Sequence, residues 1–402
     1  MNFGASENRV NPPFSISFAP ASHVMSFKPV NNCIMNASFF DKHGIRLIQA
    51  PMAGSQNHRL AAAVFLAGGL GSLPAAMLTA EQLENELSAF EEAITAGKLN
   101  ASASARAMTS APHWDGFLPV NVNFFCHTPP TAQAEKETAW RLMLAPAYQA
   151  HGIDATTVGS GPGRAPFNEE SLRLMGQFKP AVVSFHFGLP KAEWVQQLKS
   201  WGLQIWSSAT TVQEAQWLEQ HGADAIIAQG LEAGGHRGMF LTEDLSTQVG
   251  CLALLPQIVK AVKLPVIAAG GISNAAAVSA AKALSASAVQ VGTAFLTSHE
   301  ATTSALHRQA LMSEAARHTA LTNLFSGRPA RGIVNKFMRD FGPLNPEAPA
   351  FPLATAAVAP LRAAAEAQGL SDFSPLWSGQ NASDCHALPA AEIAHKLLQG
   401  WA

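Results

Sequence analysis

The sequence predicts an α/β protein built on a closed (β/α)8 barrel, the TIM-barrel fold, with an additional smaller helical domain covering the barrel mouth. Two observations support this fold class. From about residue 45 the chain alternates eight short apolar runs with helical segments, the pattern of repeated βαβ units. Polar and glycine residues gather where these runs end, and the ends of barrel strands carry the functional face. An open doubly wound sheet is the alternative, but it normally uses about five to seven strands.

The apolar runs are short and bounded by turn-forming residues, which is typical of buried parallel strands. The predicted strands span residues 46–52, 70–73, 117–125, 181–188, 204–209, 224–229, 265–271 and 288–295. Helices are predicted between them at 57–67, 134–148, 171–178, 191–201, 211–221, 252–262 and 274–284. A further helix begins after Thr79, because Thr79 with Gln82 three residues later forms a capping-box pattern.

The chain divides into four predicted segments. Residues 1–40 are polar and contain prolines, without a charged stretch followed by an apolar core, so we predict a poorly ordered arm rather than a signal peptide. Residues 41–300 form the barrel. Residues 301–375 are alanine-rich, show no strand signal and form a helical substrate-side domain. Residues 376–402 return to the barrel through a helix at 390–398.

Composition excludes several classes of function. Lys and Arg number 26 against 28 Asp and Glu, and this balance argues against a nucleic-acid partner or a membrane surface. No apolar run approaches the roughly 18 residues that a membrane-spanning helix needs. The cysteines at 33, 126, 251 and 385 are scattered without ligand-like spacing, which predicts a cytoplasmic protein with no metal site.

The most informative stretch is 229–238, where the predicted strand at 224–229 ends in Gln229 and a glycine-rich turn. Gly234 and Gly235 allow backbone N–H groups to approach a ligand, and His236 is suited to proton transfer near neutral pH. Arg237 is expected to be solvated or to brace the loop. His186, at the end of another strand, has two readings, as a functional residue or as a satisfied core histidine.

Glycine turns follow the last two predicted strands. Gly270 and Gly271 end the predicted strand at 265–271, and Gly292 and Thr293 lie within the predicted strand at 288–295. The turns after the last two strands are where barrels commonly bind phosphate. These glycines could also serve tight turns alone. Asn123 and Gln229 can donate and accept hydrogen bonds at once, which suits the edge of a heteroaromatic ring such as a flavin. A loop or capping role for Asn123 is the alternative.

Several motifs together resemble the nitronate monooxygenases, formerly called 2-nitropropane dioxygenases. The resemblance covers roughly residues 42–340 and rests on motifs at 51–54, 123, 184–188, 229–238, 268–272 and 290–293. Residues 376–380 are similar to the family's C-terminal Trp-Ala-Gly-Gln motif, and 327–332 to its Gly-Arg-Pro-Ala-Arg element. Arg328 and Arg331 in that element either brace a lid or attract an anionic substrate.

The resemblance implies a barrel that binds FMN and a reaction that uses O2 and no metal. It makes His236 the catalytic base and His186 the second catalytic candidate. The predicted flavin-binding residues are Pro51, Met52, Ala53, Asn123, Gln229, Gly234, Gly235, Gly270, Gly271, Gln290, Gly292 and Thr293.

The predicted function is therefore the oxidation of alkyl nitronates to carbonyl compounds and nitrite. Propionate 3-nitronate is one candidate substrate. The protein is expected to be a monomer or a homodimer. His236 would take the α-proton of a neutral nitroalkane as a base, or hold nitronate oxygens as a cation; burial and nearby anions shift its pKa in opposite directions. Two alternatives stay open. One is an FMN-dependent NAD(P)H reductase of enoyl-carrier-protein or quinone substrates, and the other is a flavin- or phosphate-binding protein without turnover.

Overall fold

The computed structural model describes the chain except residues 2–37, 101–113, 115, 132 and 160–163. The chain divides into two units, Met1–Ala37 and Ser38–Ala402, and the second contains the whole described fold. The predicted N-terminal arm at 1–40 thus falls almost entirely outside the described residues, as does the glycine-rich stretch at 160–163.

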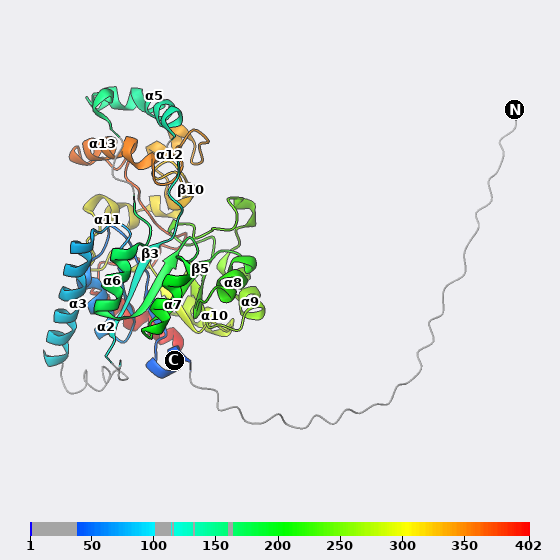
Figure 1. The fold of residues 1–402 in the computed structure, drawn as a ribbon. Coiled ribbons are helices and arrows are strands. Elements are labelled where there is room, and N and C mark those ends of the chain that lie inside the picture. The colour runs from blue at the N-terminus through cyan, green and yellow to red at the C-terminus, as the bar shows by residue number, and fades with distance from the viewer. Residues whose placement is uncertain (2–37, 101–113, 115, 132, 160–163) are drawn as a thin grey trace. The chain divides into compact units, whose positions relative to one another are not determined.

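Eight parallel strands form one barrel-shaped sheet, which confirms the predicted fold class (Figure 1). They are β1 (Leu47–Gln49), β2 (Gly71–Pro74), β3 (Leu118–Phe125), β4 (Pro180–His186), β5 (Gln204–Ala209), β6 (Ala225–Gln229), β8 (Val266–Ala269) and β9 (Ala288–Val291). Their spatial order is β1-β9-β8-β6-β5-β4-β3-β2. Backbone bonds across the seam close the barrel: Leu70 N donates to Leu47 O at 2.8 Å, and Gln49 N donates to Leu70 O at 2.9 Å. The last strand is shorter than predicted, because the chain turns into a 3-10 helix, η3 (Thr293–Phe295).

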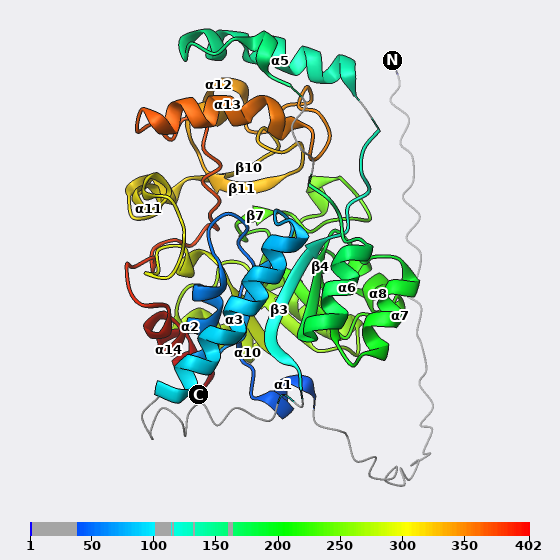
Figure 2. The same cartoon turned by 60° about the vertical axis from the view of Figure 1, so that its left-hand side comes forward.

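Alternation along the strands sorts side chains between the barrel interior and the surrounding helices. Val182, Trp206 and Ile227, from three different strands, share one buried cluster inside the barrel. The Trp206 ring stacks on Phe40 of α1 (Phe39–His43) with centroids 5.2 Å apart, so α1 packs against the interior cluster. Figure 2 shows α1 at the end of the strands away from the additional domain.

Helices cover the outside of the barrel. They are α2 (His58–Leu66), α3 (Ala80–Asn100), α6 (Glu169–Phe178), α7 (Ala192–Ser200), α8 (Val212–Gln220), α9 (Cys251–Ala261), α10 (Ala275–Ala283) and α14 (Ala390–Leu398). The predicted capping box is confirmed: Thr79 N donates to Gln82 Oε1 at 2.9 Å, and Gln82 N donates to Thr79 Oγ1 at 3.2 Å. The final helix α14 packs on α2, α10 and β1.

The additional domain, which we call the cap, contains strands that the sequence did not predict. Its helices are α5 (Ala134–Ala150), α11 (Ala305–Leu311), α12 (Lys336–Phe341) and α13 (Ala354–Ala367). An antiparallel sheet, in the order β10 (Thr319–Thr322), β11 (Ala330–Ile333), β7 (Gly235–His236), joins it to the barrel. The expectation of no strand beyond 298 is therefore wrong. These strands are short and lack an alternating pattern, so distant pairing rather than local propensity forms them.

The helix predicted at 134–148 is present as α5, but it belongs to the cap rather than to the barrel wall. Trp140 and Tyr148 are fully buried in the cap core with Leu361 of α13, and Tyr148 Oη donates to Ala357 O at 2.6 Å. Figures 1 and 2 both show α5 and α13 side by side, away from the barrel strands. The chain thus enters the cap twice, and α6 follows β3 on the barrel surface.

Two kinds of feature are absent from the part of the chain that the structure describes. No helix there is long and apolar enough to cross a membrane. No group of three or more His, Cys, Asp or Glu side chains there is placed to hold a metal ion.

The contact between α2 and β2 yields a stability prediction. A Cβ on Gly71 would lie 2.2 Å from Ala61 O of α2, so Gly71→Ala must push the helix off the sheet. We expect this variant to lower the free energy of unfolding by roughly 2–3 kcal/mol, measured by chemical denaturation. Gly159→Ala is the matched control, because a Cβ there meets nothing within 4 Å. Equal stability of the two variants would contradict the close packing.

Candidate active site

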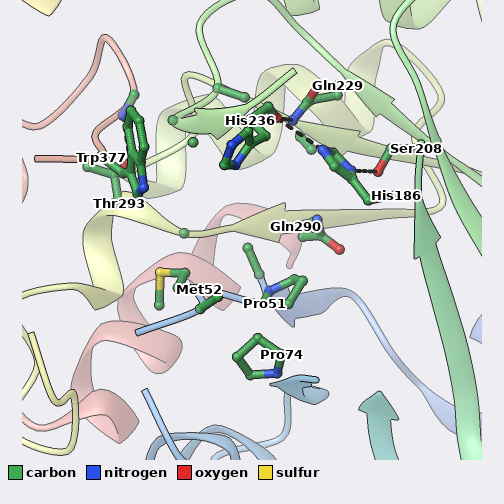
Figure 3. A pocket seen from close by; sticks show the side chains of 18 of the residues that line it. Pro51, Met52, Pro74, His186, Ser208, Gln229, His236, Gln290, Thr293 and Trp377 are labelled. Atoms are coloured by element: carbon green, nitrogen blue, oxygen red, sulfur yellow. Dashed lines mark hydrogen bonds between the residues drawn. The ribbon is translucent and has the colours of Figure 1, made fainter. Parts of the chain in front are cut away.

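A pocket opens at the C-terminal ends of the barrel strands (Figure 3). The structure brings every predicted site residue to its wall, from segments spread over most of the chain. These residues are Pro51, Met52, Ala53, Asn123, His186, Gln229, Gly234, Gly235, His236, Gly270, Gly271, Gln290, Gly292 and Thr293. The pocket places these residues together, and their roles stay predictions.

The loop at 230–241, here called the His236 loop, is held by the strand that precedes it. Gln229 ends β6 with a buried side chain, and its Nε2 donates to His236 O at 3.0 Å. Its Oε1 accepts from Gly238 N at 2.8 Å. The amide predicted to touch a ligand therefore also fixes the backbone on both sides of Arg237.

Arg237 braces the same loop from inside. Its side chain is fully buried, which excludes the predicted solvated state and confirms the bracing alternative. Nη1 donates to Gly230 O and Nη2 to Gln229 O, each at 2.8 Å, while Nε donates to Gln248 Oε1 at 2.9 Å. Hydrogen bonds to three acceptors offset part of the desolvation of this cation.

Glu214 fixes the far end of the loop. This carboxylate on α8 is fully buried, and it accepts from Thr210 N and Thr210 Oγ1 at 2.7 Å each. It also accepts from Phe240 N at 2.6 Å and from Leu241 N at 3.3 Å. Four donors on one buried carboxylate bind the end of the His236 loop to the start of α8.

His186 supports His236 through the backbone. Its Nε2 lies 3.1 Å from His236 O, and because a carbonyl only accepts, Nε2 carries the proton. Nδ1 then accepts from Ser208 Oγ at 3.0 Å (Figure 3). Burial lowers the pKa of His186 to about 4, so the ring is neutral at pH 7. Both ring nitrogens are engaged by the protein in this geometry, and the predicted catalytic role of His186 stays a prediction.

The His236 ring is held on one side by a residue that the sequence did not suggest. Its Nε2 lies 2.8 Å from Oγ of Ser326, which is 2% exposed. Aromatic rings surround the imidazole with centroids 5.4 to 6.2 Å away; they belong to Phe125, Phe187, Phe351 and Trp377. With Nε2 engaged, Nδ1 is the atom left for a ligand in the pocket.

The environment keeps His236 neutral. Burial lowers its pKa well below 6.5, and the positive charge of Arg164 lowers it further. From the sequence, burial was expected to lower the pKa of His236 and nearby anions to raise it. In the structure, burial has the larger effect. A neutral imidazole can accept a proton from a ligand at pH 7.

The backbone conformation after β8 requires glycine at positions 270 and 271. Gly270 has φ of +112° and Gly271 has φ of +72°, which side chains rarely adopt. A Cβ on Gly270 would also lie 3.1 Å from Ala233 N. The tight-turn reading therefore holds, and it is compatible with a ligand because both residues line the pocket.

The segment at 377–381, here called the C-terminal strap, crosses the same end of the pocket. A Cβ on Gly234 would lie 2.6 Å from Gly379 N, so the strap requires glycine at that position. Gly379 N donates to Thr293 Oγ1 at 3.0 Å, and Asn381 Nδ2 donates to Gly271 O at 3.2 Å. The strap thus connects the two glycine turns that were predicted to bind phosphate.

A glutamine in the pocket wall has a buried side-chain oxygen without a protein partner. Gln290 Oε1, on β9, accepts no hydrogen bond although it is shielded from solvent. Nearby polar groups differ: Asn123 Nδ2 donates to Ser184 O at 3.3 Å and Ser184 Oγ at 2.9 Å. Because this acceptor lies in the pocket wall, it is available to a donor from a ligand or an ordered water.

Arg328 and Arg331 lie behind the pocket wall. The Arg328 guanidinium sits 4.1 Å from the Phe187 ring centroid and donates to Met239 O. Arg331 Nε donates to Leu231 O at 2.9 Å. Of the two roles considered from the sequence, these contacts support bracing.

The sequence did not predict several lining or supporting residues, chiefly Arg164, Ser326 and Trp377. Trp377 belongs to a motif noted from the sequence, but nothing local placed it on the pocket. Ser326 sits in a short connection, and Arg164 follows a glycine-rich stretch with no strand or helix signal. Their proximity to His236 depends on chain segments that meet only in the folded protein.

Comparisons with known proteins agree with this geometry. The sequence profile described as nitronate monooxygenase matches residues 37–400. A nitronate monooxygenase from Paraburkholderia phytofirmans is 40% identical over 353 residues, which cover 87% of this chain and 90% of the relative. A nitronate monooxygenase from Pseudomonas aeruginosa is 39% identical, over 88% of this chain and 95% of the relative.

Solved structures share the fold. A nitroalkane oxidase from Streptomyces ansochromogenes superposes with a TM-score of 0.77 at 34% identity, covering 91% of this chain and 99% of that one. FabK from Thermotoga maritima superposes with a TM-score of 0.60 at 23% identity, over 90% of this chain and 94% of that one, and shows the fold alone.

The hydrogen bonds of His186 predict its titration. We expect it to stay neutral, with the proton on Nε2, from about pH 8 down to about pH 5.5, because its pKa lies near 4. Nitrogen NMR of the protein labelled at histidine reports the tautomer, and the His186→Phe variant identifies the signal. A proton on Nδ1 in this range would contradict the bond to His236 O.

Proposed function

Since the chain belongs to the nitronate monooxygenase family of oxidoreductases, we propose that its pocket binds FMN and that it oxidises alkyl nitronates with O2 to carbonyl compounds and nitrite. The main support for the mechanism is that His236 is neutral and lines an aromatic-walled pocket at the barrel mouth. The family is flavin-dependent, and we propose that the flavin bound by this chain is FMN.

The pocket wall fits the ring of a flavin. The edge of that ring alternates hydrogen-bond acceptors with one N–H donor. Gln290 Oε1, the buried acceptor without a partner, matches that donor. Asn123 donates to Ser184, which leaves its Oδ1 as the atom for a further donor. We therefore assign ring contacts to these two residues.

The phosphate of FMN fits the two glycine turns. Thr293 offers a hydroxyl, and Gly271 and Gly292 offer backbone at the pocket surface. The N-terminal end of α10 is less suitable, because the carboxylate of Asp384 already accepts there from Asn274 Nδ2 at 2.8 Å. We assign the phosphate to the turns rather than to this helix end.

Bound FMN would supply the electron acceptor of the reaction, with O2 as the final oxidant. The protein supplies a base and a dry chamber. Ser326 Oγ donates to Arg328 O at 3.4 Å and therefore accepts from His236 Nε2. This tautomer leaves His236 Nδ1 without a proton, so it can take the α-proton of a nitroalkane. The phenylalanine rings around it exclude water, which keeps the imidazole uncharged.

We further propose that the protein works in the cytoplasm as a monomer or homodimer. The described cysteines at 126, 251 and 385 are free thiols, which a reducing compartment maintains.

The proposed function can be tested by finding which compound, a nitronate or NADH, reduces the bound flavin. We expect the flavin absorbance of the purified protein to fall rapidly on anaerobic mixing with propyl-2-nitronate and to remain on mixing with NADH. Bleaching by NADH alone would replace this proposal with an NAD(P)H reductase. Bound flavin without any bleaching would indicate a binding protein without turnover.

The base role of His236 predicts a difference between two substrates. His236→Asn should retain FMN but lose roughly a hundredfold or more in turnover of neutral nitroalkanes, and much less with the preformed nitronate. Wild-type kcat/KM for the nitroalkane should stay level from about pH 8 down to about pH 6.5, because a depressed pKa keeps the base unprotonated. His318→Asn, at an exposed position, is the control. Equal losses on both substrates would contradict a base.

A further inference from the structure

Arg164 is a cation in the pocket wall that lacks an anion. Its Nη1 is buried and has no hydrogen-bond partner. Among the described residues, no carboxylate lies within ion-pair distance of it. The side chain as a whole is partly buried, and a shielded guanidinium donor that faces a pocket is suited to a ligand that supplies the counter-charge.

Other arginines in the fold show what a structural guanidinium does. Arg237 donates through all three nitrogens to the protein. Arg308 donates to four backbone carbonyls, at 2.7 to 3.0 Å. Both brace loops and both are satisfied by neutral acceptors. Arg164 differs because it lines the pocket and keeps a buried donor free.

The backbone and ring contacts of Arg164 hold it in place. His127 is 5% exposed, and its Nε2 lies 3.0 Å from Arg164 O, so this nitrogen donates to the carbonyl. Burial lowers the pKa of His127 to about 4, and the ring adds no charge at neutral pH. The Arg164 guanidinium lies 5.5 Å from the centroid of the Phe351 ring.

Arg164 and His236 share one chamber. The His236 ring centroid lies 5.4 Å from that of Phe351, the ring that Arg164 also approaches. The charge of Arg164 is the foremost charge effect on the pKa of His236, which agrees with their closeness. A small molecule that touches His236 can therefore reach Arg164.

The FMN phosphate is not the missing anion. Arg164 is anchored by His127, just beyond the end of β3. The glycine turns assigned to the phosphate follow β8 and β9. These strands are separated from β3 by β6, β5 and β4 on one side of the closed barrel and by β1 and β2 on the other. The anion for Arg164 must come from another molecule in the chamber.

Resting on the proposed function, we propose that Arg164 determines substrate specificity by binding a carboxylate at the end of the substrate remote from the nitronate. A guanidinium binds a carboxylate through two parallel hydrogen bonds, and the free Nη1 is available for one of them. A nitronate with a plain alkyl tail leaves Arg164 unpaired and loses this interaction. The aromatic walls strengthen the pairing because they exclude water.

Kinetics on paired substrates test the assignment. Arg164→Met should raise KM for propionate 3-nitronate at least about tenfold, while kcat/KM for butyl-1-nitronate changes by less than about threefold. Arg164→Lys should recover part of the loss, because it keeps the charge without the planar fork. Arg173→Met, on the exposed face of α6, is the control. Equal changes on both substrates, or none, would overturn the proposal.

A binding experiment separates this proposal from the proposed reaction. Succinate resembles the carboxylated nitronate in shape and charge, butyrate lacks the second charge, and neither is oxidised at a nitronate carbon. Titration of the holoprotein, followed by tryptophan fluorescence, should show succinate binding at least about tenfold tighter than butyrate, and Arg164→Met should abolish this preference. The titration decides the role of Arg164 even if no nitronate is consumed, a result that would sink only the reaction. A preference for succinate that persists in Arg164→Met would overturn the proposal.

Discussion

The arrangement of the site depends on the buried hydrogen bonds that fix the His236 loop directly after β6. The His236 carbonyl accepts hydrogen bonds from Gln229 and His186, both at the ends of barrel strands. Arg237, the next residue, turns inward and binds the carbonyls at the end of β6. One short loop therefore receives its conformation from buried polar side chains, which have few alternative partners inside the protein. The imidazole of His236 is thus positioned by the barrel strands although it lies outside them.

The same loop joins the barrel to the cap. As β7 it pairs with β11, so that Gly235 lies opposite Arg331 and His236 opposite Ala330. Gly332 of β11 in turn bridges to Trp377 of the C-terminal strap. Three segments spread between residues 235 and 377 thus meet around one histidine. Ser326 and Trp377 reach the His236 ring through this arrangement.

Burial and charge act together in the chamber. The aromatic rings remove water, which favours the neutral forms of His127, His186 and His236. Arg164 cannot lose its charge in the same way, and it lowers the pKa of His236 further. The chamber thereby combines an unprotonated base with a cation, an arrangement that suits anionic ligands with an acidic C–H bond.

The sequence alone determined the barrel and most of its wall residues. Short apolar runs ending in Gln229, in glycine turns or in His186 are local patterns, and parallel strands bring their carboxyl ends to one edge whatever the loops do. Thr79 with Gln82 was likewise readable, because a helix cap involves only four residues. The tertiary structure decided the rest. The strands β10 and β11 exist because they pair with each other and with β7, and α5 joins the cap because its apolar face meets α13. The environment of His236, the hydrogen bonds of His186 and the unpaired charge of Arg164 depend on contacts between residues far apart in the chain. Pairwise contacts of this kind leave no periodic signal in a single sequence.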